Sequence, residues 1–115
     1  MKLLDRARDA ARNAGSANPS RPGTAVLHDT ADVRQVVFRI EAGQSVPPHR
    51  SVSTVLLTVL EGTGLLSGED DGAPAECRCS AGDIVAYAPN ELHGMRADGE
   101  QLLLLATITP RPGAR

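Results

Sequence analysis

The sequence predicts one small all-β domain, a barrel or sandwich of short strands, with a short helix in front of it. The chain has 115 residues, which suits a single domain. From about residue 24 to residue 109 the apolar residues follow short strand-like segments. Turn residues such as Gly43, Gly62 and Gly82 separate several of these segments. Many short strands with turns between them are typical of an all-β sandwich or barrel.

Residues 1–23 are expected to form a helix and a linker. An apolar stripe at helical spacing runs through residues 2–13, and its members are Leu3, Leu4, Ala7, Ala10 and Ala11. The stripe is thin, so the helix must dock against the rest of the domain to be stable. Residues 15–23 are rich in Gly, Pro and Ser, which indicates a linker.

The barrel is expected to occupy residues 24–109, with a loose tail rich in Pro and Gly at 110–115. In the second strand, Val36, Phe38 and Ile40 share one face, whereas Arg39 lies on the other. This alternation predicts a half-buried antiparallel strand. The expected strands are 24–28, 34–42, 45–51, 54–61, 63–67, 75–79, 83–88, 92–97 and 101–109.

Segments 54–60 and 101–106 are apolar on both faces. One explanation is burial on both sides within the domain, and the other is contact with a second subunit. The inner face of a small barrel already fills the core, so the outer face needs a separate cover. We therefore expect a homodimer.

Charge and hydropathy exclude several classes of partner. The net charge is −2, and no basic field exists to attract nucleic acid. The longest strongly apolar run, residues 102–106, is too short to span a bilayer, and the N-terminus lacks the apolar core of a signal peptide. A cytoplasmic protein without nucleic-acid or membrane partners is expected. In that reducing compartment, we expect Cys77 and Cys79 to be reduced thiols on one face of a strand.

Two stretches of the sequence resemble the paired motifs of the cupin superfamily. In the first stretch, Gly43, His49 and Gly62 have the spacing of the first cupin motif. In the second, Gly82 and His93 have the spacing of the second motif. The resemblance covers about residues 25–109 and implies a jelly-roll β-barrel like that of small single-domain bacterial cupins, which are commonly dimers.

The second stretch departs from the motif at its turn. Pro89 comes one residue late, and Asn90 stands where Gly is usual. Asn tolerates the left-handed backbone conformation that Gly supplies at such a turn, so we expect that conformation at Asn90.

The resemblance also implies a metal site, because the family's motifs place two His and a Glu from the first stretch and a His from the second around a metal. His49 and His93 hold two of these positions, but Ser51 stands in place of the second His and Val55 in place of the Glu. Two imidazoles without a carboxylate make a weak site for a divalent transition metal. His49 and His93 are therefore an incomplete metal set. Nothing in the sequence places His28, Cys77 or Cys79 beside them.

These residues favour a pocket that binds a small molecule, with His49, Ser51 and His93 as polar anchors. A few convergent polar groups among apolar walls are the usual form of a ligand site. Two alternatives stay open: a metal-dependent enzyme of the dioxygenase or isomerase type, and a regulatory or structural dimer with a vestigial pocket. The sequence carries no other catalytic motif, and the ligand is not identified. The expected walls are Val55, Leu57, Val59 and Met95.

Overall fold

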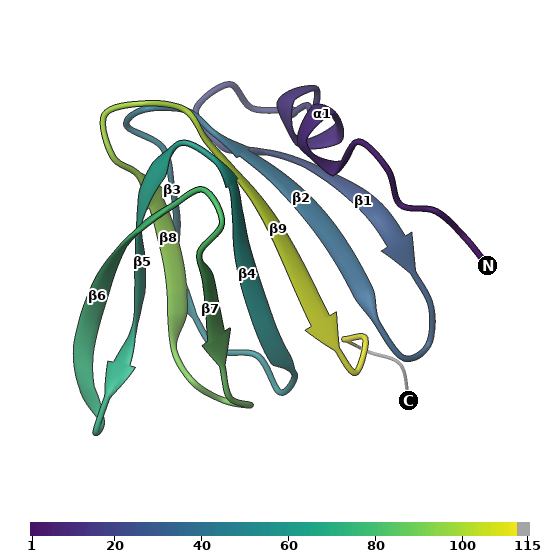
Figure 1. Cartoon of the computed structure of the whole chain (residues 1–115). Helices are drawn as coiled ribbons and strands as arrows, with labels where there is room; N and C mark the ends of the chain where they lie inside the picture. The colour runs from purple at the N-terminus through teal and green to yellow at the C-terminus, as the bar shows by residue number, and fades with distance from the viewer. Residues whose placement is uncertain (113–115) are drawn as a thin grey trace.

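Two antiparallel β-sheets pack face to face, and one short helix lies against the outside of the larger sheet (Figure 1). This computed structural model describes residues 1–112. The five-stranded sheet has the order β1-β2-β9-β4-β7, and the four-stranded sheet has the order β3-β8-β5-β6. The elements are α1 (Ala7–Arg12), β1 (Gly23–Asp29), β2 (Arg34–Ile40), β3 (Ser45–His49), β4 (Thr54–Glu61), β5 (Thr63–Asp70), β6 (Ala73–Ser80), β7 (Ile84–Tyr87), β8 (His93–Ala97) and β9 (Leu102–Thr109).

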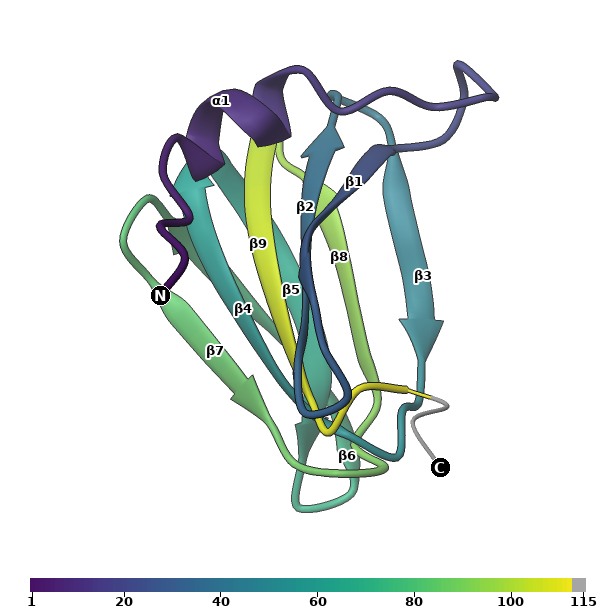
Figure 2. The same cartoon turned by 90° about the vertical axis from the view of Figure 1, so that its right-hand side faces the viewer.

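The chain crosses repeatedly between the two sheets, which is the jelly-roll arrangement predicted from the sequence (Figure 2). All nine strands form where they were expected. The hairpin of β5 and β6 is longer than predicted, because its turn is only Asp71 and Gly72, both with positive φ. An Asp-Gly pair in this conformation makes the tight turn that suits the twist of two paired strands.

The main core fills the space between the sheets. On β9, Leu102, Leu104 and Ala106 point inward, and Leu104 lies opposite Phe38 of β2 and Val59 of β4. Two members of the predicted inward face of β2 lie in this core, because Ile40 is fully buried and Phe38 packs against it. The strand is not half-buried throughout, however, because Val37 on the opposite face is also fully buried.

Helix α1 covers one end of the outer face of the larger sheet (Figure 2). Ala11 is buried there with Val37 of β2 and Leu103 of β9. The helix is shorter than the predicted 2–13. Arg6 adopts the left-handed conformation, with φ 56°, and this conformation cannot continue a right-handed helix. Leu3 therefore lies outside the helix and stays exposed.

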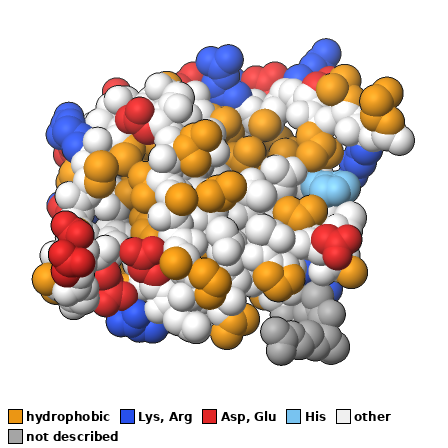
Figure 3. Space-filling view, turned by 60° about the horizontal axis from the view of Figure 1, so that its bottom comes forward, with side chains coloured by type: hydrophobic (Ala, Val, Ile, Leu, Met, Phe, Trp, Pro, Cys, Tyr) orange, Lys and Arg blue, Asp and Glu red, His pale blue; other side chains and the backbone are white. Residues whose placement is uncertain are grey.

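The rest of this outer face is apolar and uncovered by α1. Leu56 and Leu105 are half-buried, whereas Ala86 and Ile84 are exposed, Ile84 at 62%. Hydrophobic side chains spread across the upper half of the view in Figure 3. The two-sided apolar pattern of β9 is thus explained in part by α1. The homodimer stays a prediction. No helix of the described residues is long and apolar enough to cross a membrane.

Candidate functional site

Two histidines meet where β3 lies beside β8. His49 is paired in register with His93, and their ring centroids are 4.2 Å apart with the planes inclined by 58°. Gly94 permits this approach. A Cβ atom at Gly94 would lie 2.9 Å from the backbone nitrogen of Pro48 and 3.1 Å from the carbonyl oxygen of Val46. The absence of a side chain at Gly94 therefore allows β3 to lie close enough for the rings to touch.

Each imidazole is oriented by a backbone carbonyl of its own strand end. The Nδ1 atom of His49 lies 3.0 Å from the carbonyl oxygen of Pro47, and that of His93 lies 3.2 Å from the carbonyl oxygen of Glu91. A carbonyl oxygen only accepts hydrogen bonds, so in both rings Nδ1 carries the proton and donates it. A ring that carries its proton on Nδ1 alone presents the Nε2 lone pair as an acceptor.

The two rings differ in exposure. His93 is 6% exposed and His49 is exposed. Burial lowers the pKa of His93, and the neighbouring His49 lowers it further, while the hydrogen bond to the Glu91 carbonyl opposes the shift. His93 is therefore a neutral acceptor at physiological pH.

Tyr87 closes the inner side of the histidine pair. Its ring centroid lies 5.2 Å from that of His93, and its hydroxyl donates a hydrogen bond to the carbonyl oxygen of Ser67 at 2.9 Å. Burial raises the pKa of Tyr87 to about 12, so the phenol stays protonated. The sequence reasoning did not identify this residue, although its alternation on β7 places it opposite Val55.

The histidine pair opens into a cavity of about 420 Å³ between the sheets. Such a volume lies within the range of small-molecule sites, about 300–1,000 Å³. The six residues predicted as a ligand site, namely His49, Ser51, Val55, Leu57, His93 and Met95, all line this cavity. Val59, the other expected wall residue, is buried in the core and does not belong to the lining. The remaining lining residues are Phe38, Val46, Arg50, Val52, Ala106, Ile108 and Pro112.

The loop between β3 and β4 brings Ser51 to the cavity. The strand ends at His49, so the shared strand face expected for His49 and Ser51 is replaced by a turn. The Ser51 hydroxyl accepts a hydrogen bond from the Ser53 amide at 3.1 Å, and the Ser51 carbonyl accepts one from the Asn90 amide at 2.6 Å. Asn90 has φ 67°, which confirms the left-handed conformation predicted for it.

Arg50 is the charged residue of the cavity rim. Its Nη1 atom donates to Glu69 Oε1 at 2.6 Å and to the carbonyl oxygen of Asn90 at 2.8 Å. Glu69 Oε1 also accepts a hydrogen bond from the Leu92 amide, and the pKa of this carboxyl is lowered chiefly by Arg50. Sequence reasoning missed Arg50, because its partner lies on β5 and no local pattern signals the pairing.

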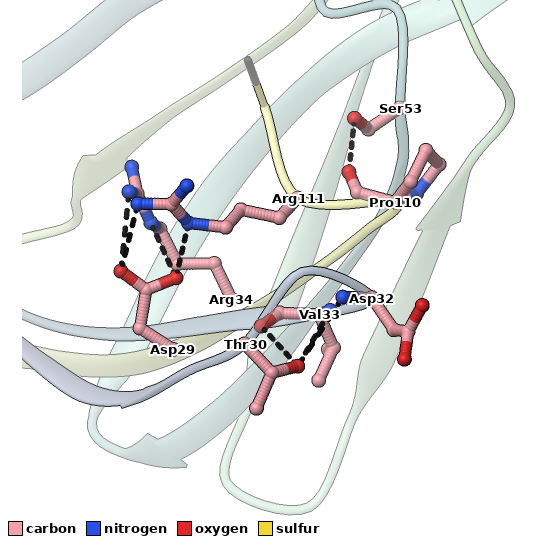
Figure 4. A network of polar contacts seen from close by, with 8 residues as sticks. All are labelled: Asp29, Thr30, Asp32, Val33, Arg34, Ser53, Pro110 and Arg111. Carbon is pink, nitrogen blue, oxygen red and sulfur yellow. Dashed lines mark hydrogen bonds and ion pairs between the residues drawn. The ribbon is translucent and has the colours of Figure 1, made fainter. Parts of the chain in front are cut away.

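The C-terminal segment borders the same cavity through Pro112. Figure 4 shows the contacts of the two residues before it, Pro110 and Arg111. The Ser53 hydroxyl donates to the Pro110 carbonyl at 2.6 Å, and the Arg111 Nε donates to Asp29 Oδ1 at 2.5 Å. Asp29 also pairs with Arg34, and its pKa is lowered by the two guanidinium groups. Of the expected loose tail 110–115, residues 110–112 are thus held by side-chain contacts, and residues 113–115 lie outside the described residues.

The donor set does not suit a tightly held metal at this site. No group of three or more His, Cys, Asp or Glu side chains that could hold a metal occurs among residues 1–112. The described residues give the cavity lining two imidazoles and no carboxylate. His28 lies on β1, and Cys77 and Cys79 lie on β6, so the structure brings none of them to the histidine pair. Tight metal binding usually takes three or four protein ligands.

Comparison with known proteins identifies the family. The profile described as the cupin domain matches residues 36–108. The chain belongs to the cupin family. A search of curated proteins found no match.

Solved structures share the same fold. An RmlC-like cupin protein from Desulfovibrio desulfuricans is 26% identical, with 96% of this chain and 97% of that chain covered and a TM-score of 0.75. KdgF from a Halomonas species is 20% identical, with coverage of 86% and 88% and a TM-score of 0.75. The DMSP lyase DddQ from Ruegeria pomeroyi is 17% identical, with coverage of 86% of this chain and 53% of that chain and a TM-score of 0.70.

Proposed function

We propose that this cupin binds a neutral small molecule that combines an apolar body with at least one hydroxyl group. The observation that carries the proposal is the pair of Nε2 acceptors, on His49 and His93, at a cavity whose other walls are mostly apolar. A ligand hydroxyl would donate a hydrogen bond to one of the two Nε2 atoms. The Ser51 hydroxyl can donate a hydrogen bond to the same ligand. The apolar body would pack against Val55 and Met95.

The charges around the cavity favour a neutral ligand. Among residues 1–112, the lining contains no carboxylate to balance a cation. A buried anion would need a protonated imidazole, which the lowered pKa of His93 opposes. The guanidinium of Arg50 is already paired with Glu69. Burying an unpaired charge is costly, so charged ligands are disfavoured relative to uncharged ones.

A metal-dependent enzyme is the weaker alternative. It would require a third ligand beside His49 and His93, and the family positions for further ligands are held here by Ser51 and Val55. The similarity to a lyase such as DddQ is at 17% identity, which supports a shared fold. A fold hosts many unrelated functions, so it does not by itself favour an enzyme.

We also propose that a second copy of the chain covers the uncovered part of the outer face of the five-stranded sheet. The outward positions there are Gln35, Leu56, Thr58, Ile84, Ala86, Leu105 and Thr107, as the strand registers show, and none of them carries a charge. A contiguous uncharged and partly apolar face of this kind is typical of a contact between subunits.

The ligand proposal is tested with matched compounds. Apolar alcohols and phenols are compared with their methyl ethers by thermal shift and isothermal titration calorimetry. A buried acceptor left without a donor costs about 1–3 kcal/mol, so we expect each ether to bind roughly 5- to 150-fold more weakly than its alcohol. The preference for the alcohol is expected to shrink in His49→Leu, and to persist in His28→Leu, whose site lies outside the cavity.

Two results would contradict the proposal. One is equal binding of the alcohols and ethers by the wild type. The other is an alcohol preference that survives His49→Leu and His93→Leu together, in protein shown by circular dichroism to be folded.

A further inference from the structure

A second cavity is lined by residues of β6, at the edge of the four-stranded sheet, and of β7, at the edge of the five-stranded sheet. Its volume is about 230 Å³. Tyr87 separates it from the histidine pair, because Tyr87 lines this cavity and its ring also faces His93. In the described part of the chain β6 pairs only with β5, and β7 pairs only with β4, so both strands are edge strands. The cavity is consequently reached from outside through an open edge.

Two thiols converge at this edge. Cys77 lines the cavity and is exposed, and Cys79 is 3% exposed in the core. Residues two apart on a strand are spaced by about 6.6 Å along the backbone. Their Sγ atoms are only 3.7 Å apart, so both side chains lean toward each other. The strand places the two residues on one face, and the side-chain rotamers bring the sulfurs into contact.

The distance between the two Sγ atoms distinguishes tetrahedral metal chelation from linear metal coordination and from a disulfide bond. Two sulfurs 3.7 Å apart, each about 2.3 Å from one ion as in zinc thiolates, subtend an angle of about 107° at that ion. This angle is close to tetrahedral. A linear two-coordinate ion would need the sulfurs about 4.6 Å apart at the same bond length. A disulfide would need them about 2.05 Å apart. Tetrahedral chelation therefore requires the least movement.

The cavity beside Cys77 is lined by three carboxylates, two of which are neutralised by arginines. Glu69, Glu76 and Glu91 line the cavity. Glu69 and Glu76 are paired with arginines, whereas Glu91 accepts a hydrogen bond from the backbone amide of Ala88. The cavity lining contains no Lys or Arg. Acidic side chains gather at the left of the view in Figure 3, the side on which Figure 1 places β5 and β6.

We propose that Cys77 and Cys79 form a bidentate site for a soft divalent cation that prefers tetrahedral thiolate coordination, such as Cd²⁺ or Zn²⁺. Among residues 1–112 no third His, Cys, Asp or Glu completes a ligand group. Structural zinc sites take four protein ligands. The protein here supplies two, so the remaining positions would be left to exchangeable ligands such as water.

The probe is Cd²⁺ alone, added to reduced, full-length protein prepared without chelator. Binding is followed by the ultraviolet thiolate-to-cadmium charge-transfer band and by native mass spectrometry. We expect one Cd²⁺ per chain. The key variant is Cys77→Ser, because Cys77 is exposed and its replacement leaves the core intact. We expect this variant to bind Cd²⁺ at least about a hundredfold more weakly, since one of two protein ligands is lost.

The matched control is His49→Leu, which breaks the histidine pair by removing one of its two imidazoles and is expected to leave Cd²⁺ affinity unchanged. The proposal is overturned if Cys77→Ser binds as tightly as the wild type, or if His49→Leu rather than Cys77→Ser abolishes binding. It is also overturned if the ion joins two chains, or if no charge-transfer band develops with equimolar Cd²⁺ at micromolar protein. Unchanged thermal unfolding of Cys77→Ser excludes misfolding as the cause of a loss.

Discussion

Replacement of Gly94 by alanine should separate β3 from β8 at the histidine pair. The added Cβ would lie 2.9 Å from the Pro48 nitrogen and 3.0 Å from the Pro48 Cα. An ordinary contact begins near 3.4 Å, so β3 must move by about 0.5 Å. Both obstructing atoms belong to the backbone of β3, so no side chain can rotate away to relieve the clash.

The cost of the Gly94→Ala substitution can be estimated from similar cases. Overpacking of this kind costs about 1–3 kcal/mol. Removing a glycine from the unfolded chain returns about 0.4–1 kcal/mol. A net destabilisation of roughly 1–2 kcal/mol is therefore expected from urea unfolding, together with faster hydrogen exchange at the Val46 amide of β3. The control is Gly15→Ala, because a Cβ at Gly15 meets nothing within 4 Å.

The reasoning about the strand contact would be refuted if Gly94→Ala were as stable as the wild type and its Val46 amide exchanged at the wild-type rate. Equal destabilisation by Gly15→Ala would also count against it, because the effect would then reflect glycine replacement in general. A loss of alcohol binding in Gly94→Ala without any change at Val46 would place the defect elsewhere.

Three further predictions concern pH, the C-terminal segment and the dimer. The pKa of His93 in the folded protein lies below its ordinary value, so the free energy of unfolding of the wild type should fall as the pH drops below about 6.5. The His93→Gln variant should lose less stability over the same pH range. Urea unfolding at pH 7.5 and pH 5.5 measures both changes. Asp29→Asn removes the partner of Arg111, so amide exchange at Arg111 should accelerate while the melting temperature of the barrel stays close to that of the wild type. Ile84→Arg should produce a monomer in sedimentation if the outer face joins two copies; an unchanged mass would oppose that interface.

Much of the fold follows from the alternation of side chains. The inward face of β2 was predictable because Phe38 and Ile40 lie two residues apart on either side of Arg39, whereas the burial of Val37 on the opposite face depends on the docking of α1. The length of the N-terminal helix was not predictable from the same kind of pattern. Its apolar stripe continues through Leu3, but the left-handed Arg6 ends the helix, and no sequence signal marks that conformation in an arginine.

The site was predictable where the resemblance to the cupin motifs, together with strand spacing, placed residues on one wall. Ser51 reaches the cavity as expected, although it does so from a turn and not from a strand. Arg50 and Pro112 were missed, because their positions depend on contacts with residues far away in the sequence. The touching thiols of Cys77 and Cys79 depend on side-chain rotamers, which strand periodicity does not determine.

The most direct test of the binding account is the tautomer of the two histidines, measured by long-range ¹H–¹⁵N correlation spectra at pH 7.5. We expect His49 and His93 both to carry the proton on Nδ1, and an added alcohol to shift the two Nε2 resonances while leaving Nδ1 protonated. A spectrum in which either ring carries its proton on Nε2, or in which His93 is doubly protonated at this pH, would contradict the account, because the cavity would then lack the paired acceptors on which ligand binding depends.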